Sequence, residues 1–136
     1  EENKKNLITT VGLNHILDTQ FHAGTQVTTW YIGLKGAGTP AAGDTMSSHS
    51  SWAEITGYSG NRKEWTEGAA SGGSMTNSSS VDFSINATAT IAGAFLNTAA
   101  TGTAGVLYGV VDFSSSRAVI SGDTLQVTVT VTAASA

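Results

Sequence analysis

The clearest structural pattern in the chain is Leu125-Gln126-Val127-Thr128-Val129-Thr130-Val131-Thr132. Apolar residues alternate there with polar residues without a break, and successive side chains of a strand point to opposite faces of a sheet. The pattern therefore predicts a strand with one face toward a core and one hydroxyl-bearing face toward solvent.

Similar signals recur upstream and predict several more short strands. They lie at 27–34, 62–70, 81–86, around 91–96, and at 105–113, where a continuous apolar run is typical of a strand buried on both faces. Between residues 41 and 60 we expect a long loop with one short strand.

One helix is expected near the start, over residues 6–21. Apolar residues recur there at three- and four-residue steps and place a stripe along one helix face. The stripe consists of Leu7, Val11, Leu13, Ile16, Leu17 and Phe21. Thr9 or Thr10 is the expected N-cap, and His22-Ala23-Gly24 is the expected stop. One short helix ahead of six to eight strands predicts an all-β fold, an antiparallel β-sandwich or jelly roll with one short N-terminal helix.

Composition narrows the range of functions. A chain of 136 residues fits one domain, 1–136, with residues 1–6 as a flexible arm. Only 12% of residues are charged and the net charge is −4, so no basic face for nucleic acid is expected. No run approaches ~20 apolar residues, and the start lacks the apolar core of an export signal, so neither a membrane span nor export is expected.

No residue pattern points to catalysis, a metal or a cofactor. His15 and His22 are two helical turns apart, and His49 lies in a Ser-rich loop without a nucleophile motif. Asp44 and Asp123 follow glycines and are typical of turns. The chain has no Cys and thus no thiolate ligand. We therefore expect no enzyme; a Ser/His or paired-carboxylate hydrolase is an alternative without a supporting motif.

One charged cluster stands out, Asn61-Arg62-Lys63-Glu64-Trp65-Thr66-Glu67. Arg and Trp are enriched among the residues that dominate protein interfaces, so Arg62, Lys63 and Trp65 are candidate partner contacts. The alternative is a solvated strand edge protected by charge, with Trp65 in the core. Lys4 and Lys5 are candidate contacts through the N-terminal arm.

The order of several segments resembles a set of small virion proteins of tailed bacteriophages. These segments are 6–12, 29–34, 42–46 with His49, 52–54, 83–87, 93–96, 105–108 and 121–125. Within that set the chain is most similar to head decoration, or cement, proteins of short-tailed phages. The likeness spans nearly the whole chain.

The resemblance implies a jelly roll on the outer surface of the capsid. Such a protein bridges neighbouring major capsid protein subunits and stabilises the head, as a dimer or trimer, without catalytic residues. The alternative is a tail-fibre or adhesin domain that binds a host surface glycan through Trp52, Tyr58 and the loop around His49. For Trp52 the other interpretation is a plug at the end of the sandwich.

Overall fold

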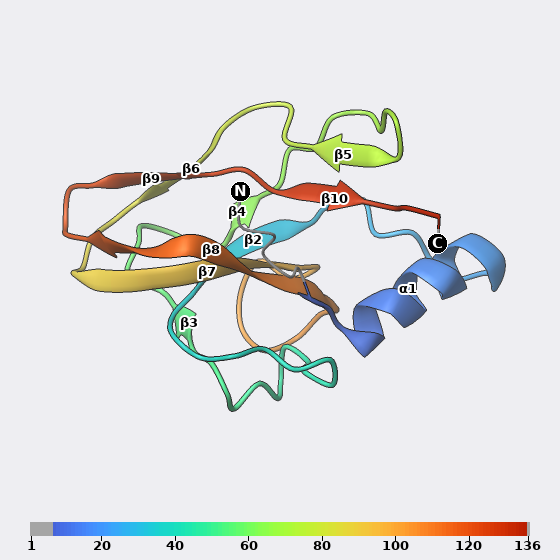
Figure 1. The fold of residues 1–136 in the computed structure, drawn as a ribbon, viewed down its shortest axis with the longest axis horizontal. Helices are drawn as coiled ribbons and strands as arrows, with labels where there is room; N and C mark the ends of the chain where they lie inside the picture. Colours follow the sequence, from blue (N-terminus) through green and yellow to red (C-terminus); the bar gives the residue numbers. More distant parts are fainter. Residues whose placement is uncertain (1–6, 136) are drawn as a thin grey trace.

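The computed structural model describes residues 7–135 as two layers of strands with one helix at the side (Figure 1). The first layer is a six-stranded sheet in the order β1-β8-β7-β2-β3, with β4 also paired to β2. Its strands are β1 (Leu7–Ile8), β2 (Tyr31–Lys35), β3 (Glu54–Ile55), β4 (Lys63–Glu64), β7 (Ala89–Asn97) and β8 (Leu107–Val119).

The second layer consists of two ribbons of two strands each. β6 (Val81–Ser84) pairs with β9 (Thr124–Val127), and β5 (Ser74–Thr76) pairs with β10 (Thr130–Thr132). The ribbons follow one another end to end above the first sheet (Figure 1). All of these pairings are antiparallel. The predicted all-β, antiparallel sandwich-like class with one short N-terminal helix is confirmed.

The main core lies between the two layers. β6 shows the predicted alternation of buried and exposed side chains: Val81 and Phe83 are buried, whereas Asp82 and Ser84 are exposed. The buried side chains Val81 and Phe83, together with Tyr58, Trp65, Ile85 and Val127, meet Ile32, Leu34, Ile91, Ala94, Leu96 and Val119 of the first sheet. Burial of this apolar surface is the main term that stabilises the fold.

A loop covers the other face of the first sheet. Met46 and Trp52 pack from this loop onto Phe95, Leu107 and Val110 in a second, smaller core. Trp52 is therefore buried, as the plug interpretation predicted, but it lies on this face of the first sheet and not at the end of the sandwich. The expected long loop with one short strand, β3, is confirmed.

The predicted strand at 125–132 is interrupted in the structure. β9 ends at Val127, β10 begins at Thr130, and the two pair with different strands. Asn77 explains the break, because its Nδ2 donates to the Val127 carbonyl at 2.9 Å and its Oδ1 accepts from the Val129 amide at 3.0 Å. A side-chain amide thus replaces a partner strand at the junction.

Three other strand predictions hold only in part. The strand expected at 27–34 begins at Tyr31, and 62–70 contains only the two residues of β4. In the apolar run at 105–113, Leu107 and Val110 are buried but the other residues from 108 to 113 are half-buried. Burial on both faces was the wrong prediction for them because the two ribbons of the second layer do not cover the whole of β8.

Helix α1 (Thr10–Phe21) begins later than predicted because Leu7–Ile8 form β1 beside β8. Thr9 is the N-cap: its hydroxyl accepts from the Gly12 amide at 3.1 Å and donates to the Leu107 carbonyl. The Thr9 amide also donates to the Tyr108 carbonyl at 3.1 Å. The start of α1 is thereby fixed to β8.

The helix ends at the predicted stop. The amides of His22 and Gly24 both donate to the Asp18 carbonyl, at 3.0 and 2.8 Å. Ala23, not Gly24, takes the left-handed conformation with φ +53°, which closes the last turn.

Candidate interaction surfaces

Arg62, one of the predicted partner contacts, lies inside the chain with its side chain only 2% exposed. Its guanidinium forms a two-pronged pair with Glu54: Nε lies 2.8 Å from Oε1 and Nη2 lies 2.7 Å from Oε2. It also donates to the carbonyls of Ala99 at 2.9 Å and Gly102 at 2.6 Å. Arg62 therefore joins β3 to the loop between β7 and β8.

The guanidinium of Arg62 also lies 5.2 Å from the centre of the Phe95 ring. A planar cation between an aromatic ring, a carboxylate and two carbonyls has nearly all of its donors occupied. The positive charge of Arg62, which suggested a contact with a partner, instead stabilises the fold of this chain.

Trp65 is also buried, and its indole Nε1 donates to Asn77 Oδ1 at 2.7 Å. The alternative interpretation, Trp65 in the core, is confirmed. Lys63 is half-buried, and its Nζ donates to the Ser59 carbonyl at 2.7 Å. A partner contact needs exposed side chains, and Arg62 and Trp65 do not supply them; a contact through Lys63 stays a prediction.

The other two predicted contacts, Lys4 and Lys5, lie outside the described residues 7–135. Their role in an arm stays a prediction.

The aromatic residues suggested for glycan binding point inward. Trp52 is buried and donates from Nε1 to Asp44 Oδ2 at 2.9 Å. His49 stacks on the Trp52 ring, with centroids 4.0 Å apart. Tyr58 is buried against Phe83. Trp52 and Tyr58 therefore do not form an exposed platform for a sugar.

Two tyrosines have shifted acidities. The pKa of Tyr58 is raised to about 12, first by burial and then by the nearby Glu54 carboxylate, whereas the Arg62 guanidinium opposes the shift. Burial also raises the pKa of Tyr108. Both shifts hold the phenols in their neutral form, which suits packing rather than acid–base chemistry at neutral pH.

A buried ion pair was missed by the sequence analysis. Lys35, at the end of β2, is fully buried, and its Nζ donates to Asp112 Oδ1 at 2.7 Å. The Gly36 and Gly38 carbonyls accept its other two hydrogen bonds, at 3.0 and 2.6 Å. A lysine that directly continues an apolar strand was the available signal. With all three donors satisfied, Lys35 holds the start of the 36–53 loop on β8.

Within residues 7–135, no three or more His, Cys, Asp and Glu side chains gather where a metal ion could bind. His15 packs against the Trp30 ring at 5.5 Å, whereas His22 lies 3.7 Å from Asp18 at the exposed helix end. In the same part of the chain, no helix is long and apolar enough to cross a membrane.

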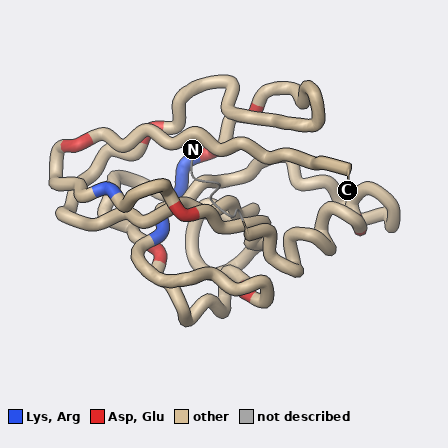
Figure 2. The backbone as a smooth tube through the Cα atoms, in the orientation of Figure 1, with Lys and Arg blue, Asp and Glu red and all other residues tan. Residues whose placement is uncertain are grey.

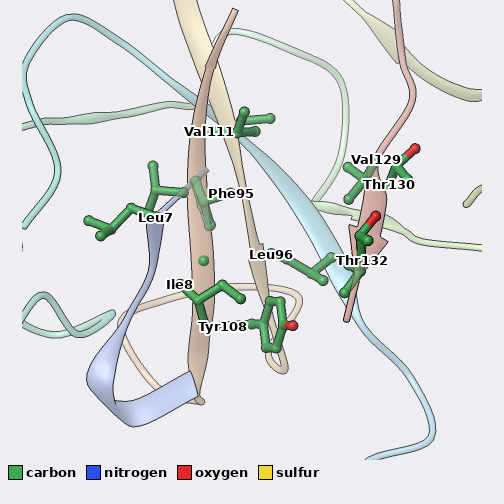
Figure 3. A pocket seen from close by; sticks show the side chains of 13 residues that line it. Leu7, Ile8, Phe95, Leu96, Tyr108, Val111, Val129, Thr130 and Thr132 are labelled. Atoms are coloured by element: carbon green, nitrogen blue, oxygen red, sulfur yellow. The ribbon is translucent and has the colours of Figure 1, made fainter. Parts of the chain in front are cut away.

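An apolar pocket of about 240 Å³ opens between β10 and the edge of the first sheet (Figure 3). It is lined by parts of β1, β7, β8 and β10, and Leu7, Ile8, Tyr108 and Val111 are among the lining residues. All residues from 129 to 132 contribute, so the pocket borders the edge of β10 as well as one face of it.

That edge of β10 carries main-chain groups without a partner strand among the described residues. The amides of Val129 and Ala133 point toward β5, donating to Asn77 Oδ1 at 3.0 Å and to the Gly73 carbonyl at 2.8 Å. Because amide directions alternate along a strand, those of Thr130 and Thr132 point to the opposite edge. We call this edge, with the adjoining pocket, the β10 groove.

A second exposed apolar feature is α1. Among the described residues 7–135, five large apolar side chains are well exposed, and four of them lie on this helix: Leu13 (47%), Ile16 (41%), Leu17 (55%) and Phe21 (80%). The fifth, Ile120 (60%), lies between β8 and β9. The turn that joins these two strands is at the end of the molecule away from α1 (Figure 1).

Comparison with known families gives a match. The model of the family described as podophage GP4 fiber I protein gp80 matches residues 7–134. The chain belongs to this family. It is a structural protein of bacteriophage virions, which confirms the resemblance at that level, whereas the family description names a fibre and not a head decoration protein. A search of curated proteins gives no match.

Proposed function

We propose that this member of the family is a non-enzymatic assembly protein of the virion exterior, which decorates the outer surface of the head. In this role it bridges neighbouring major capsid protein subunits and stabilises the capsid. The family match over 7–134 supports a structural role in the virion, and the resemblance of the segment order to head decoration proteins supports a place on the head.

The β10 groove is the observation that carries the proposal. A strand of a neighbouring protein that adds to this edge would pair with the main chain at Thr130 and Thr132 and place apolar side chains in the pocket. Such an attachment depends on main-chain groups and small apolar contacts. It therefore needs none of the distinctive surface side chains that the chain lacks.

The charge distribution is compatible with attachment of this kind. Within residues 7–135, the positions of Lys, Arg, Asp and Glu are thinly scattered along the backbone and not gathered in one segment (Figure 2). A lattice of capsid subunits offers many equivalent sites, and a dimer or trimer of this protein would engage several together. Modest individual contacts then combine into firm attachment.

A place within a fibre is the second candidate, and the family description favours it. The same groove would then hold a neighbouring fibre component instead of a capsid subunit. A host glycan, if one is bound, would need a site other than Trp52 and Tyr58, because both are buried.

Gold-labelled antibody against this protein on intact virions, viewed by electron microscopy, tests the location. Label spread over the head supports decoration. Label confined to the tail or its fibres contradicts decoration and supports the second candidate. Release of DNA from virions with and without the protein, on heating, then measures stabilisation of the head.

The variant Thr132→Pro tests the β10 groove. Proline removes an amide from the unpaired edge and leaves the β5 ladder intact, as edge strands tolerate. We expect binding to virions that lack the protein to fall at least tenfold. Thr132→Val, which also loses the hydroxyl contact with Ser74 but keeps the amide, is the matched control and should bind as the wild type does. Equal binding by both variants would contradict a role for this edge.

A further inference from the structure

Helix α1 presents an unusual face to the sheet. Gly12 is buried, His15 and Thr19 are half-buried, and the helix packs on β8 through this small and polar side. A Cβ at Gly12 would lie 2.3 Å from the Tyr108 carbonyl oxygen, so the backbone of the helix approaches β8 as closely as a glycine permits. Gly12 and the Thr9 cap together determine which face turns inward.

The opposite face therefore turns to solvent, and it is the apolar one. Leu13, Leu17 and Phe21 are spaced four residues apart and form one row along the helix, about 12 Å long at 1.5 Å per residue. Ile16 flanks the row. These four side chains are the α1 stripe, and they are four of the six apolar residues from which the helix was predicted. Of the other two, Leu7 lies in β1 and Val11 is half-buried.

We infer that the α1 stripe is the surface through which two copies of this chain associate, helix against helix about a twofold axis. The inference rests on the proposed function, which includes a dimer or trimer of this protein. It names the surface through which that oligomer forms. It does not depend on whether the protein occupies the head or a fibre.

Charge favours a second copy as the occupant. In a twofold contact each patch meets the same patch, so any charge at its centre would face a like charge. The α1 stripe carries no charge, and α1 contains no Lys, Arg or Glu. Its one acidic residue, Asp18, lies beside the row and 3.7 Å from His22.

The exposed area also suits a dimer. At the fractions given above, the four residues expose about 450 Å² of mainly apolar surface, taking ~200 Å² for a fully exposed large residue. A stable interface buries about 800 Å² per partner with an apolar centre and a polar rim. The α1 stripe supplies such a centre, and exposed Asn14 and Gln20 lie beside it on the helix.

The geometry predicts which residues meet. A row with four-residue spacing packs against a second such row at a crossing angle of about −50°. Leu17 is the middle of the row, so it lies nearest the crossing point and opposite Leu17 of the second copy. Leu13 and Phe21 of each copy then lie on either side of this crossing point.

Engineered cysteines test this arrangement directly, because the chain has no cysteine of its own. Leu17→Cys should form a disulfide-linked dimer under mild oxidation at least tenfold faster than Ile120→Cys. Ile120 is the matched control, since it is exposed to a similar degree but lies outside the helix. Equal rates for the two variants would overturn the inference.

Sedimentation of the purified full chain provides the second measurement. We expect the wild type and Ile120→Asp to associate with the same dissociation constant, and Leu17→Asp to weaken association at least a hundredfold. Phe21→Ser, at the most exposed position, is the second variant should Leu17→Asp fail to fold by circular dichroism.

Two sedimentation results would overturn the inference. One is a wild type that stays monomeric at every concentration. If Leu17→Asp then also loses binding to virions, the α1 stripe contacts another virion protein and not a second copy. The other is an oligomer that Leu17→Asp and Phe21→Ser leave intact. Gold labelling tests the virion location separately, so the two proposals fail by different observations.

Discussion

Residues 62–65 and helix α1 depart from the usual relation between polarity and burial in opposite directions. The first segment is charged, yet Arg62 and Trp65 are buried. The second has an apolar row, yet Leu13, Leu17 and Phe21 are exposed. Each location follows from the partners that the segment finds within its own chain.

For Arg62 those partners are numerous. Glu54, the Ala99 and Gly102 carbonyls and the Phe95 ring surround the guanidinium and replace the water that it loses. The α1 stripe has no such partners among the described residues, because Gly12 turns the other helix face toward β8. Whether a side chain finds its partners within its own chain therefore distinguishes a structural residue from a candidate interface residue better than residue type does.

The largest effect is expected from Arg62→Ala, which leaves Glu54 and two carbonyls without a partner. We expect the free energy of unfolding, measured by urea denaturation, to fall by about 3–5 kcal/mol. The neighbouring Lys63→Ala loses a contact with the Ser59 carbonyl and is the control, with a loss below about 1 kcal/mol. Similar losses for the two variants would contradict the distinction between the buried charge of Arg62 and the more exposed charge of Lys63.

A smaller effect is expected from the titration of Tyr58. Its pKa is about 12 in the folded chain against 10.0 for an ordinary tyrosine, so folding favours the protonated form. Its contribution to stability is fully present below pH 10 and is lost as the pH rises through 12, by about 2–3 kcal/mol. Urea denaturation between pH 9 and about 12 should show this loss in the wild type and a shallower one in Tyr58→Phe. Parallel curves would contradict the shift.

Trp65→Phe sharpens the account of the same core. The phenyl ring retains most of the apolar contact but leaves Asn77 Oδ1 without the indole donor at the junction of β9 and β10. We expect a loss of about 1–2 kcal/mol in the free energy of unfolding. Asn77→Ala should cost more, since it removes three hydrogen bonds, and the reverse order would contradict the role given to Asn77.

The smallest effect is expected for the α1 stripe. Leu17→Ser should change the free energy of unfolding of the monomer by no more than about 0.5 kcal/mol, because Leu17 is 55% exposed. Measurement at a concentration low enough to keep the chain monomeric checks this. A loss of several kcal/mol would show that Leu17 packs inside the chain.

The fold class could be predicted from the sequence because local patterns determine it. Alternation at Val81, Phe83 and Ile85 marks a strand with one buried face, and the structure confirms it. The break between β9 and β10 could not be predicted, since it depends on the side chain of Asn77, about fifty residues away. The pattern at 125–132 records which face is buried and not which strand is the partner.

The candidate surfaces were harder to predict for the same reason. Arg62 looked like an interface residue because its partner Glu54 lies eight residues away and its carbonyl partners lie near residue 100. The stripe on α1 was visible in the sequence, but its direction depends on Gly12 meeting Tyr108. Periodicity gives the faces of a helix, and packing decides which of them is covered.

Hydrogen–deuterium exchange of the full chain at low and high protein concentration tests the central contrast most directly. Amide exchange in α1 should slow as the concentration rises, because a second copy covers the helix, whereas exchange at 54–65 should stay the same. Exchange in α1 that does not depend on concentration, or slowing confined to 54–65, would contradict the account.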